Sequence, residues 1–191
     1  MEQATIHIKN MVCNRCIKVV KEELEKLGYR VHSIILGEAT IQTENKLEFD
    51  LINKVLNENG FELIDSRHSR IIEKIKIIVI ETIRDMSEGK LEEVSFTDFL
   101  QDNLNLSYQY LSTLFSSSEG ITIEKFIILQ KIEKVKELIV YDELSLSEIA
   151  YRLGYSSVQH LSSQFKKITG LTPSHFKSIK NLKRNPLDKI I

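Results

Sequence analysis

The sequence predicts an α+β domain followed by an all-α domain, on the strength of three observations. Within about the first 65 residues, short stretches of alternating apolar and polar residues are interspersed with two stretches of helical spacing. After Asp65 the strand signals stop and helical spacing continues. In the second half, short helical blocks begin at or beside Ser or Thr and several end at Gly, as capped helices do. Two compact domains are also a reasonable expectation for 191 residues.

The first region contains four predicted strands and two predicted helices. Ile6 and Ile8 alternate with polar residues and predict a strand over 5–11. The helix that follows has apolar residues at steps of three and four, and a glycine at its end: Ile17, Val20, Leu24, Leu27 and Gly28. The remaining elements are strands over 30–36 and 38–43 around a turn at Gly37 and Glu38, a helix over 50–60 and a strand over 61–65. This βαββαβ order is the split βαβ, or ferredoxin-like, arrangement.

The second region is predicted to be helical throughout. One long helix over 69 to about 87 would serve as a connector or as the first helix of the next domain. Shorter helical blocks follow over 95–105, 107–120, 122–142, 145–155, 157–170 and 172–180. Two of them form helix-turn-helix units, because "SYQYLSTLF" then "SEGIT" returns as "SVQHLSSQF" then "ITGLT". We therefore expect domains at 1–66 and 96–180, a helical connector at 67–95 and a basic tail at 181–191.

Charge is distributed unevenly along the chain, although the formal net charge is only −1. Residues 1–66 carry 8 Lys and Arg against 11 Asp and Glu, which gives −3. Residues 155–191 carry 7 against 1, which gives +6. The basic end of the chain is where an anionic partner would bind.

Several classes of protein are disfavoured. The first residues lack the pattern of a secretory signal, and the longest uncharged apolar run, "IIVI" at 77–80, is far too short to cross a membrane. We therefore expect a cytoplasmic protein with no membrane partner. The chain offers no paired carboxylates, phosphate-binding glycine loop or Ser, His and Asp arrangement that belongs to one site. We therefore expect no enzymatic activity.

The helical repeat suits DNA, because a helix-turn-helix places its second helix in the major groove. Two units joined by a long helix, here 123–140, would reach successive grooves on one face of DNA. Residues 144–178 resemble the second helix-turn-helix of the AraC/XylS family of bacterial transcription regulators. The residues that carry this resemblance are Ile149, Ala150, Gly154, Tyr155, Phe165, Lys166, Lys167, Gly170, Pro173 and Phe176.

The first repeat matches this family less fully. It keeps Leu111, Phe115 and Gly120 but has Ser116 and Ser117 where the family usually has lysines. The connecting helix also has Lys131 where Arg is common and Val135 where Ala is common. The resemblance implies a sequence-specific transcription regulator that binds double-stranded DNA. RNA polymerase and a second copy of the chain, in a homodimer, are the further partners that it suggests.

The resemblance also implies which side chains read the bases. They lie on the second helix of each unit, here called the reading helix, two residues before and one and two residues after its core leucine. These positions are Gln109, Ser112 and Thr113 in the first unit, and Gln159, Ser162 and Ser163 in the second. Gln pairs with adenine, and the hydroxyl groups of Ser and Thr can hydrogen-bond to several bases. None of these six positions holds an Arg or Lys that could pair with guanine. We therefore expect a binding site that is rich in A and T, with Lys166 and Lys167 on phosphates.

A second motif lies at the front of the chain, where Cys13 and Cys16 are the two cysteines of the sequence. We expect Met11 to end the first strand, Cys13 to lie in the loop and Cys16 to open the helix, whose N-terminus favours a thiolate. Two thiolates at this spacing suit two-coordinate Cu(I), and soft thiolates also select Zn(II) or Hg(II). The pair is therefore a candidate metal site.

Residues 8–29 and 57–65 resemble the heavy-metal-associated (HMA) domain of copper chaperones and copper-pumping ATPases. The shared motif is Met-x-Cys-x-x-Cys, with Asn10 where Gly is usual and Val12 where Thr is usual. The resemblance implies Cu(I) as the ligand, Met11 as a core anchor and not a ligand, and Phe61 against the metal loop.

Other interpretations of the cysteine pair stay open. A closed zinc site needs four ligands, so two chains would have to share the ion. A thioredoxin-like redox site usually adds a proline, which this half of the chain lacks. The domain could also be a metal-free interaction module, or the chain a metal chaperone without sequence-specific DNA binding. We expect the five histidines to be surface or capping residues: His7, His32, His68, His160 and His175.

Overall fold

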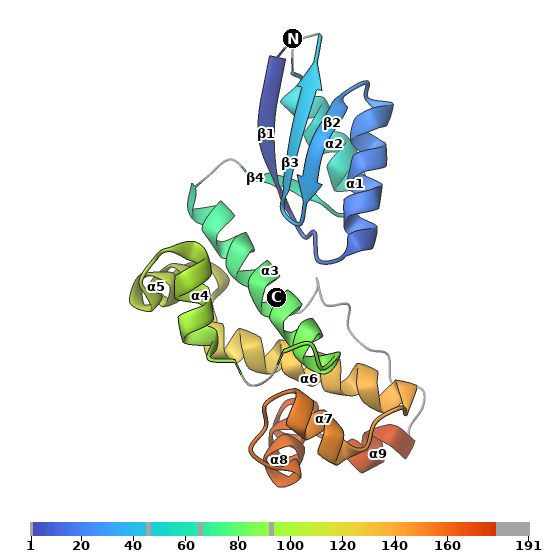
Figure 1. Cartoon of the computed structure of the whole chain (residues 1–191), viewed down its shortest axis with the longest axis vertical. Coiled ribbons are helices and arrows are strands. Elements are labelled where there is room, and N and C mark those ends of the chain that lie inside the picture. Colours follow the sequence, from blue (N-terminus) through green and yellow to red (C-terminus); the bar gives the residue numbers. More distant parts are fainter. Residues whose placement is uncertain (1, 45–46, 65–66, 92–93, 179–191) are drawn as a thin grey trace. The chain divides into compact units, whose positions relative to one another are not determined.

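The chain divides into two compact units, Met1–Ile77 and Ile78–Ile191. The computed structural model in Figure 1 describes residues 2–44, 47–64, 67–91 and 94–178, so the predicted basic tail at 181–191 lies outside the described residues. The division falls inside one long helix, α3 (Arg67–Ser87). The beginning of that helix therefore belongs to the first unit and its end to the second.

The first unit is a four-stranded antiparallel sheet with two helices packed on one face, followed by the beginning of α3 (Figure 1). Its elements before α3 are β1 (Glu2–Lys9), α1 (Asn14–Lys26), β2 (Arg30–Ile35), β3 (Glu38–Thr43), α2 (Phe49–Glu58) and β4 (Glu62–Ile64). The strands lie in the order β2-β3-β1-β4. The order of elements along the chain is the predicted one.

The core of this unit lies between the sheet and the two helices. Alternation along β1 and β3 turns one set of side chains toward the helices, where they are almost fully buried: Ile6, Ile8, Ala39 and Ile41. Val20 and Leu24 of α1 and Ile52 and Leu56 of α2 cover them. Burial of each large apolar side chain contributes about 1.5–3 kcal/mol to folding.

The opposite face of the sheet is polar. His7 pairs with Glu38 across β1 and β3, with 3.5 Å between Nδ1 and Oε2, and Thr5 and Thr40 share a hydrogen bond. His32 of β2 bonds Gln42 of β3 in the same way. Each of these pairs crosses between neighbouring strands, so they reinforce the register that the buried face sets.

Two local details of the first unit differ from the prediction. The first strand runs from Glu2 to Lys9, so Met11 lies in the loop and does not end the strand. Asn10 ends it, because a φ of 71° takes the backbone out of the extended region. The first helix begins at Asn14 with Cys13 as its N-cap residue, so Cys16 lies within the first turn and does not open the helix.

The second unit is helical wherever it has regular structure within the described ranges. After the end of α3 it contains α4 (Phe96–Leu104), α5 (Tyr108–Glu119), α6 (Ile123–Tyr141), α7 (Leu146–Arg152), α8 (Val158–Thr169) and α9 (Pro173–Ser178). No helix in these ranges is both long and apolar enough to cross a membrane.

The helices of the second unit repeat at an interval of fifty residues. Ser95 and Ser145 cap α4 and α7, and Ser107 and Ser157 cap α5 and α8, each by accepting a hydrogen bond from a backbone N–H in the first turn. The ends correspond too, because Gly120 and Gly170 close α5 and α8 in the left-handed conformation. The predicted degenerate repeat is therefore a structural repeat.

Candidate nucleic-acid interface and thiol pair

The two reading helices, α5 and α8, are anchored by the same apolar contacts. Leu111 and Phe115 of α5 are fully buried, as are Leu161 and Phe165 of α8. The ring of Phe115 packs on Phe126 of α6 with 5.5 Å between centroids, and Phe165 packs on Phe176 of α9 at the same distance. These rings fix which side of each helix faces the core, and so which side faces outward.

The predicted base-reading residues lie on the outward side. Gln109, Thr113, Gln159 and Ser163 are exposed, and Ser112 and Ser162 are half-buried. Their spacing of three and four residues places each set on one face of its helix, away from the core leucine and phenylalanine. In α5 the Thr113 hydroxyl donates to the Gln109 carbonyl, so that hydroxyl has a partner before any base approaches.

The predicted phosphate-binding residues, Lys166 and Lys167, are exposed in the last turn of α8. The corresponding positions of α5 are Ser116 and Ser117, whose hydroxyls donate to carbonyls of their own helix. Positive charge is therefore present on the second reading helix and absent at the same place on the first, as the sequence indicates.

Lys131 of α6 lies close to both helix-turn-helix units. Its Nζ is 5.5 Å from the centroid of the Phe96 ring, at the start of α4, and 5.5 Å from that of Tyr155, in the turn before α8. The ammonium group therefore makes a cation–π contact with each unit. Tyr108 of α5 adds a hydrogen bond from its hydroxyl to the Glu124 carboxylate of α6, and this bond lowers the pKa of Glu124.

The turn of the second helix-turn-helix packs against the end of α3. Gly154 has a φ of 68°, and a side chain there would bring its Cβ within 3.2 Å of the Met86 Cε atom. Arg152 donates from Nη1 to the backbone carbonyl of Ser87 at 2.9 Å. The Tyr155 hydroxyl donates to Gln164, and burial of this tyrosine raises its pKa.

Two exposed side chains lie near the start of the reading helices: Tyr110, for which no role was expected from the sequence, and His160, which was expected only as a surface or capping residue. They lie fifty residues apart and so occupy equivalent positions, directly after Gln109 and Gln159. The Nδ1 atom of His160 bonds the Ser156 hydroxyl, and its ring lies edge-on to Tyr155. The fifty-residue interval is the signal that could have identified the pair.

Two helix-turn-helix units that each turn a polar helix face outward define the class of the second unit as a DNA-binding domain. Residues 100–179 match a family model described as a helix-turn-helix domain. The C-terminal half of the chain thus contains a helix-turn-helix DNA-binding domain.

Relatives of this half are transcription regulators. The chain is 33% identical over 82 residues to the xylose operon regulatory protein of Escherichia coli K12, a match that covers 43% of this chain and 21% of that protein. It is 34% identical over 79 residues to the Msm operon regulatory protein of Streptococcus mutans, a match that covers 41% of this chain and 28% of that protein. The chain therefore aligns with less than a third of the length of either regulator.

Among solved structures, the C-terminal domain of AraT, a response regulator from Geobacillus stearothermophilus, is 26% identical. That match covers 63% of this chain and 94% of the AraT domain, with a TM-score of 0.49.

In the first unit, the cysteine pair lies at the junction of the β1–α1 loop and helix α1. The Sγ atoms of Cys13 and Cys16 are 3.5 Å apart, and both residues are half-buried free thiols. The Cys13 carbonyl accepts hydrogen bonds from the backbone N–H groups of Cys16 and Ile17, as befits an N-cap residue. The two sulfurs are therefore adjacent and accessible to a small ion or a reagent.

The two thiols differ in acidity. Burial on its own would raise the pKa of Cys13, but hydrogen bonds from the Cys16 backbone, the Cys16 thiol and the Arg15 backbone outweigh burial and lower it. Burial raises the pKa of Cys16, and its hydrogen bond to Cys13 raises it further. The thiolate is thus favoured at Cys13 over Cys16, because burial raises the pKa of Cys16 although that residue lies in the first turn of the helix.

Three contacts hold the loop before the cysteines. Met11 is fully buried in the core of the first unit, and Phe61 belongs to the same core. The Asn10 side chain donates from Nδ2 to the Gly60 carbonyl at 3.0 Å, and its backbone N–H donates to Oε1 of Glu73 at 2.7 Å. The role of Glu73 could not be predicted from the sequence, because no local pattern joins residues that are 63 positions apart.

The donor set fits a thiophilic ion of low coordination number. Among the described residues, no three or more His, Cys, Asp or Glu side chains are placed to share a metal ion. His7 and His32 therefore do not complete a metal site with the two cysteines. Two adjacent soft sulfurs, one of them with a lowered pKa, are donors that Cu(I) and other thiophilic ions prefer.

Proposed function

We propose that this chain is a sequence-specific transcription regulator whose first unit, a ferredoxin-like domain of the heavy-metal-associated type, binds a thiophilic ion through Cys13 and Cys16. Cu(I) is the ion that we expect, with Zn(II) and Hg(II) as alternatives. The observation that carries the regulatory part is the repeated pair of reading helices, each with a buried Leu and Phe and an outward polar face.

The DNA contacts follow from that outward face. Gln109 and Gln159 are the residues that we expect to read adenine, and the four hydroxyl residues near them would accept or donate at neighbouring bases. Lys166 and Lys167 would contact phosphates and set the position of α8 in the groove. RNA polymerase and a second copy of the chain are proposed as further partners on the resemblance alone.

The metal-binding part is supported by the pair of sulfurs. Their separation of 3.5 Å and the lowered pKa of Cys13 are the properties of a site that exchanges a proton for a soft ion. The strand order β2-β3-β1-β4 and the position of the pair between β1 and α1 support the domain type.

Regulation by the ion requires more than binding. The ion has to favour one state of the protein over another, because a ligand with equal affinity for both states shifts neither. We therefore expect the affinity for the operator to differ between the metal-free and metal-loaded protein. The direction of that difference shows whether the ion promotes or releases DNA binding.

The test is footprinting of the full chain on genomic fragments, with and without Cu(I), beside the variant with Cys13→Ser and Cys16→Ser. We expect protection of a defined, A- and T-rich site whose affinity changes with Cu(I) in the parent protein and does not change in the variant. Sequence-blind, strongly salt-dependent binding would instead favour the metal chaperone. Site-specific binding that ignores both metal and cysteines would leave a regulator with a metal-free interaction module.

A further inference from the structure

Helix α3 contacts the loop that carries the cysteine pair. Glu73 is only 5% exposed, and its Oε1 atom accepts a hydrogen bond from the backbone N–H of Asn10 at 2.7 Å. Asn10 lies three residues before Cys13. At this distance the backbone N–H makes a well-formed hydrogen bond to the buried carboxyl oxygen.

The backbone of Asn10 is in the left-handed region, with a φ of 71°. This conformation is uncommon for residues other than Gly, although Asn adopts it more readily than most. The Gly60 carbonyl holds the side chain of Asn10 and Glu73 holds its backbone. The shape of the loop at Asn10 therefore depends on a residue of α3.

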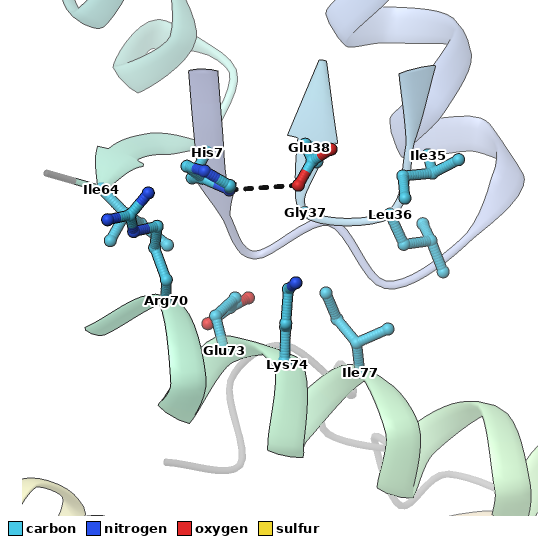
Figure 2. A pocket seen from close by; sticks show the side chains of 10 residues that line it. All are labelled: His7, Ile35, Leu36, Gly37, Glu38, Ile64, Arg70, Glu73, Lys74 and Ile77. Atoms are coloured by element: carbon cyan, nitrogen blue, oxygen red, sulfur yellow. Dashed lines mark ion pairs between the residues drawn. The ribbon is translucent and has the colours of Figure 1, made fainter. Parts of the chain in front are cut away.

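The position of Glu73 is in turn fixed by packing of α3 at the end of the sheet. Figure 2 shows Glu73, Lys74 and Ile77 of α3 directed toward the β2–β3 turn. A Cβ atom at Gly37, in that turn, would lie 2.7 Å from the Ile77 Cδ1 atom, and the Gly37 carbonyl accepts from the backbone N–H of Ile8. Between helix and turn there is a small cavity of about 30 Å³.

The same helix continues into the second unit. There Met86 packs against Gly154, and the Ser87 carbonyl accepts the hydrogen bond from Arg152. Both partners belong to the end of α7 and the turn before the reading helix α8. One helix thus contacts the loop of the thiol pair with its first half and the second helix-turn-helix with its last turn.

An ion bound by the pair would be held by the Sγ atoms of Cys13 and Cys16, which are 3.5 Å apart, and it would replace their thiol protons. Cys16 is inside the first turn of α1, so Cys13 and the loop before it are the parts that can move.

We propose that Glu73 is a positioning residue of the metal loop, and that its hydrogen bond to Asn10 couples occupation of the Cys13 and Cys16 pair to helix α3. This inference rests on the proposed metal binding. Linkage then requires that any change which uncouples Asn10 from Glu73 also changes the affinity for the ion.

The test uses the full chain and three single variants. Glu73→Met fills similar space in the helix but removes the acceptor, whereas Glu73→Gln keeps an acceptor oxygen at the same place. Glu81→Gln is the matched control, because Glu81 lies on the same helix and makes an ion pair with Arg84 at a partly exposed site. The probe is Cu(I), with affinity measured by competition against a chromophoric Cu(I) chelator.

The first readout needs no metal and no DNA. Hydrogen exchange of the Asn10 amide should be slow in the parent, Glu73→Gln and Glu81→Gln proteins and should become at least about five-fold faster in Glu73→Met. The Cu(I) affinity of Glu73→Met should change by about five-fold or more, the lower range of typical coupling, while Glu73→Gln stays near the parent value. Unchanged exchange and unchanged Cu(I) affinity in Glu73→Met would overturn the inference.

The second readout is the ratio of operator affinities with and without Cu(I). We expect this ratio to fall toward one in Glu73→Met and to be kept in Glu73→Gln and Glu81→Gln. If the operator affinity of the parent protein responds to Cu(I) and Glu73→Met keeps the same ratio, the coupling is overturned and the proposed function stands. A ratio of one in the parent protein itself would instead refute metal regulation, and the amide and Cu(I) measurements would still decide whether Glu73 positions the loop.

Discussion

Arg152 and Ser87 are joined by a hydrogen bond of 2.9 Å, in which the guanidinium donates from Nη1 to the backbone carbonyl. Ser87 is the last residue of α3, and its carbonyl has no acceptor role within its own helix. A charged donor from α7 therefore satisfies a helix end. This bond ties the helix-turn-helix that most resembles AraC/XylS regulators to the end of α3.

Replacement of Arg152 by Ala should destabilise the second unit by about 1.5–3 kcal/mol, because a partly buried carbonyl loses a charged partner. Arg84→Ala is the control, since its ion pair with Glu81 is partly exposed and should contribute less than about 1 kcal/mol. Urea unfolding followed by tyrosine fluorescence measures the difference, because Tyr29 is the one tyrosine of the six in the first unit. Equal losses in the two variants would contradict this assignment.

Replacement of Lys166 and Lys167 by Gln should weaken DNA binding equally on specific and random sequences. If each lysine neutralises one phosphate, the slope of log affinity against log salt should become shallower by about 1.8. The control is Lys18→Gln with Lys21→Gln, on α1, where each lysine pairs with a glutamate four residues later. A slope that changes as much in the control as in the α8 variant would place the phosphate contacts elsewhere.

Gln159→Ala should cost about 1–3 kcal/mol on the preferred DNA site and almost nothing on random DNA, because a bidentate contact to a base is lost. Gln109→Ala should have the same kind of effect at a separate position of the site. Ser118→Ala, exposed near the end of α5, should leave both affinities unchanged. Binding to a library of single-base variants measures all three, and a uniform loss across the library would show that Gln159 does not read sequence.

Cys13 should react with iodoacetamide faster than Cys16 at neutral pH, because the thiolate is the nucleophile and it is favoured at Cys13. As pH rises, the Cys13 reaction should reach its plateau first. Trypsin cleaves after Arg15, so the two cysteines fall in separate peptides whose labelling mass spectrometry measures independently. Denatured protein is the control, in which the two rates should converge. Faster labelling of Cys16 in the folded chain would contradict the acidity assigned to the pair.

The elements of this protein could be predicted from sequence wherever a local signal marks their ends. Ser95, Ser107, Ser145 and Ser157 each cap a helix as expected, and β3 has the predicted bounds because the turn at Gly37 precedes it. The start of α1 was missed because Cys13, which caps it, is not a residue type that favours caps.

The contacts that depend on tertiary structure could not be predicted. Glu73 reads in the sequence as one polar residue on the outside of a helix, yet it is buried because the Asn10 amide and the β2–β3 turn lie against it. Lys131 likewise reads as a departure from a family pattern, and the structure places its ammonium group beside the rings of Phe96 and Tyr155. Neither partner is within reach of a local pattern.

The interval of fifty residues has a consequence for the geometry of a DNA site. In a twofold dimer the reading helices face opposite ways, and a palindrome matches them. Here α5 and α8 follow one another along a single chain with different side chains, Gln109 and Tyr110 in one and Gln159 and His160 in the other. A monomer bound through both helices would therefore have a polarity on the double helix, and inverting the site relative to a promoter would turn the first unit toward the opposite side.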